Sequence, residues 1–415
     1  MRGTGSWRRA GPRFALPEVR RLAFTVSSVS TPTIPSISEQ FQQTYGRAPA
    51  IIARAPGRVE FIGNHTDYNG GAVLGAAINR YVWVAAAANP NGRLRLASAN
   101  SPTVLDLPAD PGSRITGSDS WANYPLGVWR SLRDFKLPAP AGFDLLVDSD
   151  LPPGAGLSSS AALELAVGLA LLGLEKAPAI DPAQLAALGR HAENKYVGVP
   201  CGILDQGTSA FGRAGHLVHI DCRGPAFARV PLPAGAHLWI FNTREKHALI
   251  DGFYATRHRE CMDAAAALGV ALLADLTPEQ YLAVEGKLPP VLARRARHVV
   301  MEHARVQETV AALQRGDLMA AGRLLTASHR SSQNLFENST AALDRLVDLL
   351  EVHPAVLGAR LTGGGFGGAV LALTRDNFTE ADAAEIGRRQ AEHQHRVPEV
   401  LHLQSADGAQ VIWSG

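Results

Sequence analysis

The segment Pro152-Pro-Gly-Ala-Gly-Leu-Ser-Ser-Ser-Ala-Ala162 joins a strand-like run at 143–147 to a helix that we expect to begin near Ser159. Its small residues allow backbone N–H groups to point at an anion. Its three hydroxyls add donors, and the helix that follows offers the positive end of its dipole. The segment therefore predicts a phosphate-binding loop. It is not a Walker A loop, because no Gly-Lys-Ser/Thr follows. The alternative is an ordinary turn with a serine helix cap, but a cap needs only one serine.

On both sides of this loop, strand-like and helix-like segments mix without regular alternation. Strands are indicated at 51–53, 59–62, 72–87, 94–97, 143–147, 217–220 and 237–241. Helices are indicated at 182–196, 254–268, 291–313, 341–350 and 380–393, and a glycine turn with a strand at 361–374. Asp181 and Pro182 suit the N-cap and first position of the first of these helices. The pattern favours an α+β fold over a doubly wound parallel sheet.

Composition indicates a globular chain of one or two domains. It has 415 residues, of which 46% are hydrophobic and 19% charged, so a large core can form and disorder as the main state is excluded. The net charge of +2 gives no reason to expect a nucleic-acid partner. Cys201, Cys222 and Cys261 cannot form a disulfide framework, which indicates a reducing compartment such as the cytoplasm. No window reaches the roughly 18 apolar residues that a membrane span needs.

The first stretch of the chain differs from the rest. Residues 1–30 contain six arginines and a single acid, Glu18. We expect a disordered extension over 1–36, with a targeting signal as the alternative. Residues 30–38 are rich in Ser, Thr and Pro and indicate a linker, so order is expected to begin near residue 37.

A second glycine-rich segment, Gly363-Gly-Gly365-Phe-Gly-Gly368, formally matches the dinucleotide-binding pattern G-x-G-x-x-G. That pattern requires a helix after the glycines, whereas here an apolar β-like run follows at 369–374. We therefore reject a dinucleotide site. A turn that lets the backbone approach a ligand fits better.

Polar residues gather in three further places. Arg58, Glu60 and the run from Asn64 to Asn69 bring many donors and acceptors together, which suits a polyhydroxylated ligand, with a plain polar surface loop as the alternative. Glu193 ends a helix, and Asp205 lies in a mostly apolar segment at 200–206, which suggests a carboxylate held inside for a purpose. Trp121 and Tyr124 suit either a core or a sandwich around a purine base.

Three of these segments together resemble a known family. Residues 55–71 resemble the galactokinase signature, while 155–162 and 362–368 resemble the second and third motifs of the wider GHMP small-molecule kinases. The resemblance covers residues 37–415. It implies two α+β lobes, at 37–225 and 226–415, with the active site between them. It also implies transfer of the ATP γ-phosphate to the anomeric hydroxyl of galactose, with Mg²⁺ as cofactor.

The resemblance further implies roles for individual residues. Asp205 matches the catalytic aspartate that accepts the sugar hydroxyl proton, and Arg58 matches the arginine that supports this aspartate and stabilises the reacting oxygen. Ser160 and Glu193 match the Mg²⁺ ligands, although which serine of 158–160 touches the metal stays open. Sugar contacts are implied for Asn64, His65, Asp67, Gly202 and Tyr254. Nucleotide contacts are implied for Trp121, Tyr124, Gly154, Gly156, Leu157, Ser158, Ser159, Ser160, Gly364 and Gly365.

One position departs from the family pattern. The usual run is Arg-Val-Asn-Leu-Ile-Gly-Glu-His, and here it is Arg58-Val-Glu60-Phe-Ile-Gly-Asn64-His65. Asn64 replaces a glutamate that the resemblance places on the sugar 6-hydroxyl, and an amide donates as well as accepts and carries no charge. Weaker galactose binding, or a substrate altered at C6, would follow. A compensating role for Glu60 stays open, because the sequence does not place its side chain.

Three functions are therefore compared. The first is a galactokinase. The second is another sugar 1-kinase, acting on arabinose, galacturonate or N-acetylgalactosamine. The third is a catalytically silent sensor of sugar and ATP, which would be expected to lose part of the loop or the base. In each case we expect small-molecule partners, no nucleic acid, no membrane, and a monomer.

Overall fold

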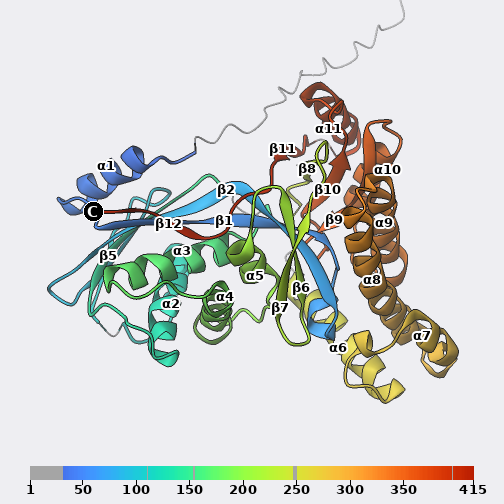
Figure 1. Cartoon of the computed structure of the whole chain (residues 1–415), viewed down its shortest axis with the longest axis horizontal. Helices are drawn as coiled ribbons and strands as arrows, with labels where there is room; N and C mark the ends of the chain where they lie inside the picture. The colour runs from blue at the N-terminus through green and yellow to red at the C-terminus, as the bar shows by residue number, and fades with distance from the viewer. Residues whose placement is uncertain (1–30, 110, 153–154, 246–249, 395) are drawn as a thin grey trace, which may run out of the picture.

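The computed structural model describes residues 31–109, 111–152, 155–245, 250–394 and 396–415, which form two β-sheets with helices packed on them (Figure 1). The α+β prediction is confirmed. One sheet has eight strands, with the order β12-β1-β2-β5-β3-β4 and with β6 joining β2 to β7. The other sheet has four strands in the order β11-β8-β10-β9. Among the described residues, no helix is long and apolar enough to cross a membrane.

The strands are bounded as follows. The first sheet contains β1 (Ile51–Ile62), β2 (Ala72–Ala88), β3 (Leu94–Ser98), β4 (Leu105–Leu107), β5 (Phe143–Ser149), β6 (His216–Asp221), β7 (Ala226–Pro231) and β12 (Gln410–Ser414). The second contains β8 (His237–Asn242), β9 (Val356–Thr362), β10 (Ala369–Thr374) and β11 (Glu399–Leu403).

The helices are bounded as follows. They are α1 (Ile34–Tyr45), α2 (Asn123–Asp134), α3 (Ser159–Leu174), α4 (Pro182–His191), α5 (Leu204–Phe211), α6 (Ile250–Leu268), α7 (Pro278–Val284), α8 (Pro290–Gln314), α9 (Leu318–Ser331), α10 (Ala341–Glu351) and α11 (Glu380–Gln394).

The first sheet is buried on both faces, because successive side chains of a strand point to opposite sides. Ile52 of β1 packs in the cluster that contains α1, whereas Ile51 and Ala53 pack in the main core that contains α3. Helix α3 is apolar almost all round and is buried accordingly. The long antiparallel pair β1–β2 thus forms the spine of this half of the molecule (Figure 1).

The second sheet is also covered on both faces. Residues of α10 and α11 pack on one face in a separate apolar cluster, while α8 and α9 join the main core on the other. Helix α9 lies very close to β9. A Cβ atom added at Gly358 would overlap the backbone of Gly322, so the contact requires glycine at both positions. The two glycines therefore set the distance between this helix and this strand.

Three structural features bear on the expected division of the chain into an extension and two lobes. Helix α1 begins at Ile34, inside the expected linker, because Thr33 and Ser36 form a capping box and Pro35 occupies the first turn. A lobe boundary after residue 225 would cut the hairpin of β6 and β7. The C-terminal strand β12 returns to pair with β1, so the first sheet includes the end of the chain.

Two further elements differ from expectation. Asp205 lies in the first turn of the short helix α5, not in an irregular loop. Helix α9, for which Asp317 provides the N-cap, was not predicted. The helices expected near Ser159 and after Asp181 are confirmed, and the side chain of Asp181 caps α4 by accepting from Ala183 and Gln184.

Candidate active site

The centre of the candidate site is a contact between Arg58 of β1 and Asp205 of α5. Arg58 Nε donates to Asp205 Oδ1 at 2.8 Å, and Nη2 lies 2.6 Å from the same oxygen. Arg58 Nη1 donates to the carbonyl oxygen of Gly156 at 2.8 Å. The backbone N–H of Arg58 donates to the carbonyl oxygen of Leu157 at 3.1 Å. One arginine, almost fully buried, thus fixes both the carboxylate and the glycine-serine loop.

The loop itself is not an ordinary capped turn. Ser158 precedes α3 in the left-handed conformation, with φ +56°, and makes no helix-capping hydrogen bond. Its hydroxyl instead donates to Asp205 Oδ2 at 2.6 Å. A left-handed conformation is uncommon for a residue other than glycine and is maintained by its surroundings. Gly154, for which a nucleotide contact was expected, lies outside the described residues.

A cavity of about 200 Å³ opens beside this carboxylate. It brings together the two expected catalytic residues and all five expected sugar contacts. Its lining is Arg58, Glu60, Gly63, Asn64, His65, Asp67, Pro200, Cys201, Gly202, Leu204, Asp205, Tyr254, Gly363 and Gly364. Segments of β1, α5, α6 and the turn before β10 thus meet at one place, although they lie far apart in the sequence.

His65 joins two of the sequence motifs. Its Nε2 lies 2.9 Å from the carbonyl of Gly364, which can only accept, so Nε2 donates and Nδ1 accepts from the Tyr68 hydroxyl at 3.0 Å. Burial lowers the pKa of His65 to about 3, so the ring is neutral. Its ring also packs against Tyr254, with centroids 5.0 Å apart.

Asp67 forms another wall of the cavity and packs against Gly202. A Cβ atom at Gly202 would overlap Asp67 Oδ2, so any larger residue there would push the Asp67 carboxylate out of its present position. Burial raises the pKa of Asp67 to about 6, and the neighbouring carboxylates of Glu60 and Asp205 add to the rise. Its surroundings therefore bring the pKa of Asp67 close to neutral pH, and above about pH 6 the ionised carboxylate can accept hydrogen bonds from a ligand.

Glu193 lies in a π-helical turn after α4 and faces a small polar cluster. Its Oε2 accepts from Gln206 Nε2 at 2.7 Å and from Cys201 Sγ at 3.2 Å. Gln206 Nε2 also donates to the buried Glu164 at 2.9 Å. Burial raises the pKa of Glu193, and Asp205 raises it further, while the Ser160 hydroxyl is close enough to lower it.

This cluster fits a magnesium ion shared with phosphate groups. The Glu193 carboxylate and Ser160 hydroxyl are hard oxygen donors, and Glu164 Oε1 is buried without a partner, so the cluster has excess acceptor capacity. No group of three or more His, Cys, Asp and Glu suited to a metal occurs in the described part of the chain. Magnesium is commonly bound through one or two carboxylates plus substrate phosphates.

A second cavity, of about 340 Å³, lies at the start of α3. Trp121 and Tyr124 line it together with Ser159, Ser160 and apolar residues. The aromatic pair and the serine loop therefore border one space, as a purine base with a phosphate tail would need. Burial raises the pKa of Tyr124 to about 12, so its hydroxyl stays protonated.

The resemblance implies that the third motif, Thr362 to Gly365, closes over both the phosphates and the sugar, and two of its glycines have distinct surroundings. Gly364 lines the cavity beside Asp205 and contacts Tyr254, whereas Gly365 packs on Asn338. Neither lines the aromatic cavity. Gly365 adopts φ +80°, and a side chain there would overlap the Asn338 carbonyl, which explains the glycine.

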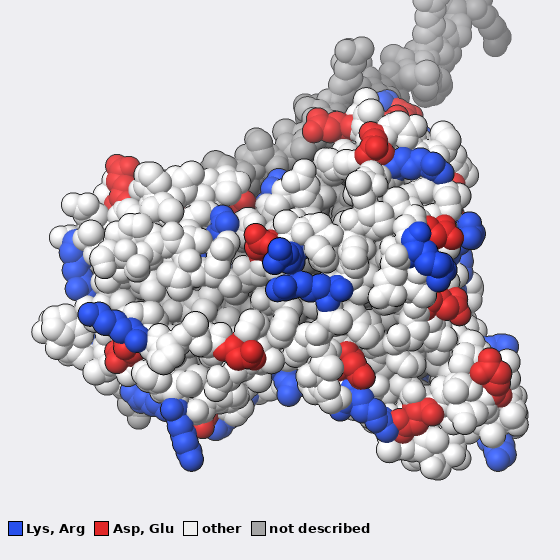
Figure 2. Space-filling model, viewed as in Figure 1, with Lys and Arg blue, Asp and Glu red and all other residues white. Residues whose placement is uncertain are grey.

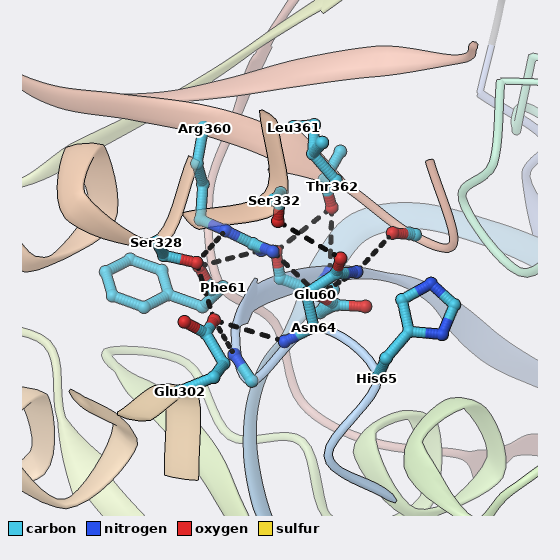
Figure 3. A network of polar contacts seen from close by, with 12 residues as sticks. Glu60, Phe61, Asn64, His65, Glu302, Ser328, Ser332, Arg360, Leu361 and Thr362 are labelled. Carbon is cyan, nitrogen blue, oxygen red and sulfur yellow. Dashed lines mark hydrogen bonds and ion pairs between the residues drawn. The ribbon is translucent and has the colours of Figure 1, made fainter. Parts of the chain in front are cut away.

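Sequence reasoning missed two buried charges beside the cavity. Arg360 of β9 is completely buried and binds Glu60, while Glu302 of α8 accepts from the backbone N–H groups of Gly63 and Asn64 at 3.2 Å (Figure 3). A signal for Arg360 was available. It is a charge in an otherwise apolar run directly before the third glycine motif.

Three family models match successive parts of the chain. The galactokinase galactose-binding signature matches residues 39–88, the N-terminal domain of GHMP kinases matches 123–213, and their C-terminal domain matches 309–393. Fold and motifs thus define a small-molecule kinase of the GHMP class, whose members use ATP.

Solved structures narrow this assignment. Lactococcus lactis galactokinase, solved with galactose, is 31% identical, has a TM-score of 0.86, and covers 91% of this chain and 99% of its own. The chain belongs to the galactokinase family. The Methanococcus jannaschii mevalonate kinase is 19% identical with a TM-score of 0.62 over 87% of this chain and 100% of its own, and shares the fold.

Proposed function

We propose that this protein transfers the γ-phosphate of ATP to the anomeric hydroxyl of D-galactose, forming galactose 1-phosphate. The observation that carries the proposal is the Asp205 carboxylate. It is bound to Arg58 on one oxygen and to Ser158 of the phosphate loop on the other, at the wall of a cavity lined by the galactose signature. Acceptor activation and phosphate binding would then occur at adjoining groups.

In this proposal Asp205 accepts the proton of the attacking sugar hydroxyl, and Arg58 keeps the carboxylate oriented and favours developing negative charge. Phosphoryl transfer depends mainly on positioning and charge stabilisation, with little covalent chemistry for the protein to perform. Ser159 and Ser160 start α3 and add hydroxyl donors to the helix N-terminus, where phosphate oxygens bind well.

Glu193 and Ser160 are the residues that would hold Mg²⁺. When bound, the ion neutralises charge on the β- and γ-phosphates. Gln206 orients Glu193 by donating to Oε2 at 2.7 Å. Trp121 and Tyr124 would enclose the adenine base in the neighbouring cavity.

The sugar would be held by short, preorganised groups. Asp67 accepts hydrogen bonds from ring hydroxyls, Gly202 leaves it the space to do so, and the neutral His65 fixes the turn at Gly364. Tyr254 closes the cavity from α6. We propose that the protein works in the cytoplasm as a monomer. Light scattering of the purified chain tests the oligomeric state.

A second candidate is another sugar 1-kinase, favoured by Asn64 in place of the family glutamate. A panel of galactose, arabinose, galacturonate and N-acetylgalactosamine with ATP distinguishes the two. ADP release is measured by a coupled assay, and the product is identified by ³¹P NMR. Galactose as the sugar with the highest kcat/KM supports the proposal. Binding of sugar and ATP without ADP formation would instead indicate a sensor and overturn it.

A further inference from the structure

The side chain of Asn64 has no hydrogen-bonding capacity left for a ligand. Its Nδ2 donates to Glu60 Oε1 at 3.1 Å and to the Gly363 carbonyl at 2.7 Å. Its Oδ1 accepts from Asn338 Nδ2 at 2.7 Å and from Ser332 Oγ at 3.3 Å. An amide offers two N–H donors and two lone pairs, and all four are used within the protein. Asn64 therefore joins the first and third motifs rather than contacting the sugar.

Glu60 lies directly beside it and does have free capacity. Its Oε1 accepts from Asn64 and from Arg360 Nη2, the latter at 2.9 Å. Its Oε2 has no hydrogen-bond partner within the described residues, yet it is not among the fully buried unpaired atoms. Glu60 lines the cavity, and only 6% of its side chain is exposed. One carboxylate oxygen is thus available to a ligand in that cavity.

Arg360 holds this carboxylate in place. Its Nη1 donates to the carbonyls of Glu60 and Phe61 at 3.2 and 3.3 Å, and its Nε donates to Ser328 Oγ at 3.1 Å. Figure 3 shows the Glu60 and Asn64 side chains together at the centre of this network, between Arg360 and His65. Burial raises the pKa of Glu60 and the Arg360 guanidinium opposes the rise. The hydrogen bonds of Arg360 thus hold the Glu60 carboxylate in one orientation.

We propose that Glu60 is the specificity-determining residue for the exocyclic C6 group of the sugar, with Asn64 as its positioning residue. The acceptor that the family resemblance places at position 64 is then supplied four residues earlier, from β1. This inference rests on the proposed function and refines it. The substrate it favours carries a neutral hydroxyl donor at C6.

Chemistry at C6 explains why other sugars would be disfavoured. A pentose or a 6-deoxy sugar leaves a nearly buried carboxylate oxygen without a donor, and sites built to bind a hydroxyl discriminate strongly against analogues that lack it. A uronic acid brings a second carboxylate beside Glu60. Arg360 is already engaged with Glu60, Phe61 and Ser328 and has little left to offer it.

The first test uses the unmodified protein. The kcat/KM is measured for galactose, 6-deoxygalactose, L-arabinose and galacturonate with saturating ATP-Mg. We expect galactose to exceed 6-deoxygalactose by about 100-fold or more. Equal values for these two, or galacturonate as the best substrate, would overturn the inference. If no sugar is phosphorylated, it is the proposed function that fails.

The second test uses variants. Glu60→Gln preserves shape, and we expect it to lower kcat/KM for galactose about 10- to 100-fold while changing that for 6-deoxygalactose less than about threefold. The double exchange Glu60→Asn with Asn64→Glu restores the family arrangement and should recover the preference for galactose. Two results would contradict the role of Glu60 at C6. One is a ratio of kcat/KM for galactose to kcat/KM for 6-deoxygalactose that is unchanged in E60Q, and the other is a double variant that does not recover the preference for galactose.

Melting temperature and nucleotide binding are measured for each variant. Glu399→Gln is the matched control, since Glu399 is also a buried carboxylate paired with an arginine, Arg244, but does not line the cavity. In the Glu399→Gln variant, the ratio of kcat/KM for galactose to kcat/KM for 6-deoxygalactose should equal the ratio in the unmodified protein. If E60Q does not fold, the double variant and the sugar comparison still decide.

Discussion

The Ser158 hydroxyl donates a 2.6 Å hydrogen bond to Oδ2 of Asp205, so the phosphate loop and the candidate base are in direct contact. This contact uses the hydroxyl that would otherwise cap α3 and keeps Ser158 in a left-handed conformation. A carboxylate bound on both oxygens has little freedom to rotate. The arrangement supports a preorganised acceptor for a proton, at the place where sugar and phosphate would meet.

Asp205→Asn tests this role with minimal change of shape. The amide cannot accept the proton of the sugar hydroxyl, and we expect kcat to fall about 10²- to 10⁴-fold. Nucleotide binding, measured by calorimetry without sugar, should stay within about threefold, because Asp205 does not line the aromatic cavity. Turnover near that of the unmodified protein would remove Asp205 from catalysis.

Glu193→Gln tests the magnesium site. Removing a residue that hydrogen-bonds to a metal ligand typically lowers metal affinity about 10- to 100-fold, and removing the ligand itself lowers it at least as much. The Mg²⁺ concentration for half-maximal activity should therefore rise by about tenfold or more. Sugar affinity measured without nucleotide should not change, and an equal loss of sugar affinity would point to general disruption of the cavity.

Local sequence signals predicted the helix caps and the loop, because these depend on neighbouring residues. Asp181 and Pro182 begin α4 as expected, and the serine-rich segment lies between β5 and α3. Helix α5 has no such signal, since Ile203 occupies its N-cap without a capping bond. Asp205 was singled out by its apolar neighbours in the sequence and then by resemblance, not by the helix that carries it.

Long-range pairings could not be predicted in this way. Glu60 and Arg360 lie 300 positions apart, and neither residue alone indicates the other. The same holds for β12, whose pairing with β1 places the end of the chain in the first sheet.

The net charge of the sequence predicted only a general property of the surface. On the face in Figure 2 positive and negative side chains are interspersed, in keeping with the small net charge.

Gly202→Ala tests the packing of the sugar cavity. The new methyl group would displace Asp67 Oδ2, and losing a ligand's hydrogen bond to a charged acceptor costs about 1.5–3 kcal/mol, or roughly 10- to 150-fold in sugar affinity. Calorimetry with galactose gives the change directly. Gly224→Ala is the control, because Gly224 is exposed with no atom near its Cβ position, and it should bind galactose normally. Equal effects of both substitutions would contradict the close packing of Gly202 against Asp67.

The pKa of Asp67, raised by burial to about 6, predicts two opposite pH trends. The ionised group accepts hydrogen bonds, so galactose affinity without nucleotide should rise as the pH increases through about 6. Because the folded pKa exceeds the ordinary value of 3.8, the folded state binds more protons between these values. The contribution of Asp67 to the free energy of unfolding is therefore lost as pH increases through the same range.

Asp67→Asn should weaken both trends, which calorimetry and thermal melting between pH 4 and 8 measure; the buried carboxyl groups of Glu60 and Glu193, whose pKa values are also raised, keep their own share. His65 cannot account for them, because its pKa of about 3 leaves the ring neutral throughout. An undiminished pH dependence of galactose binding in the Asn variant would assign the titration to another group.

Gly358→Ala tests how the second sheet holds the site. The added methyl group would overlap the Gly322 backbone of α9, and helix and strand backbones yield less readily than side chains. We expect a loss of about 1–3 kcal/mol or more in the free energy of unfolding, measured by urea denaturation. Because β9 also carries Arg360, galactose affinity should fall as well. The control Gly286→Ala, at an exposed position with no atom near its Cβ, should be neutral or slightly stabilising. A stable Gly358→Ala variant would show that α9 can move away from β9 at little energetic cost.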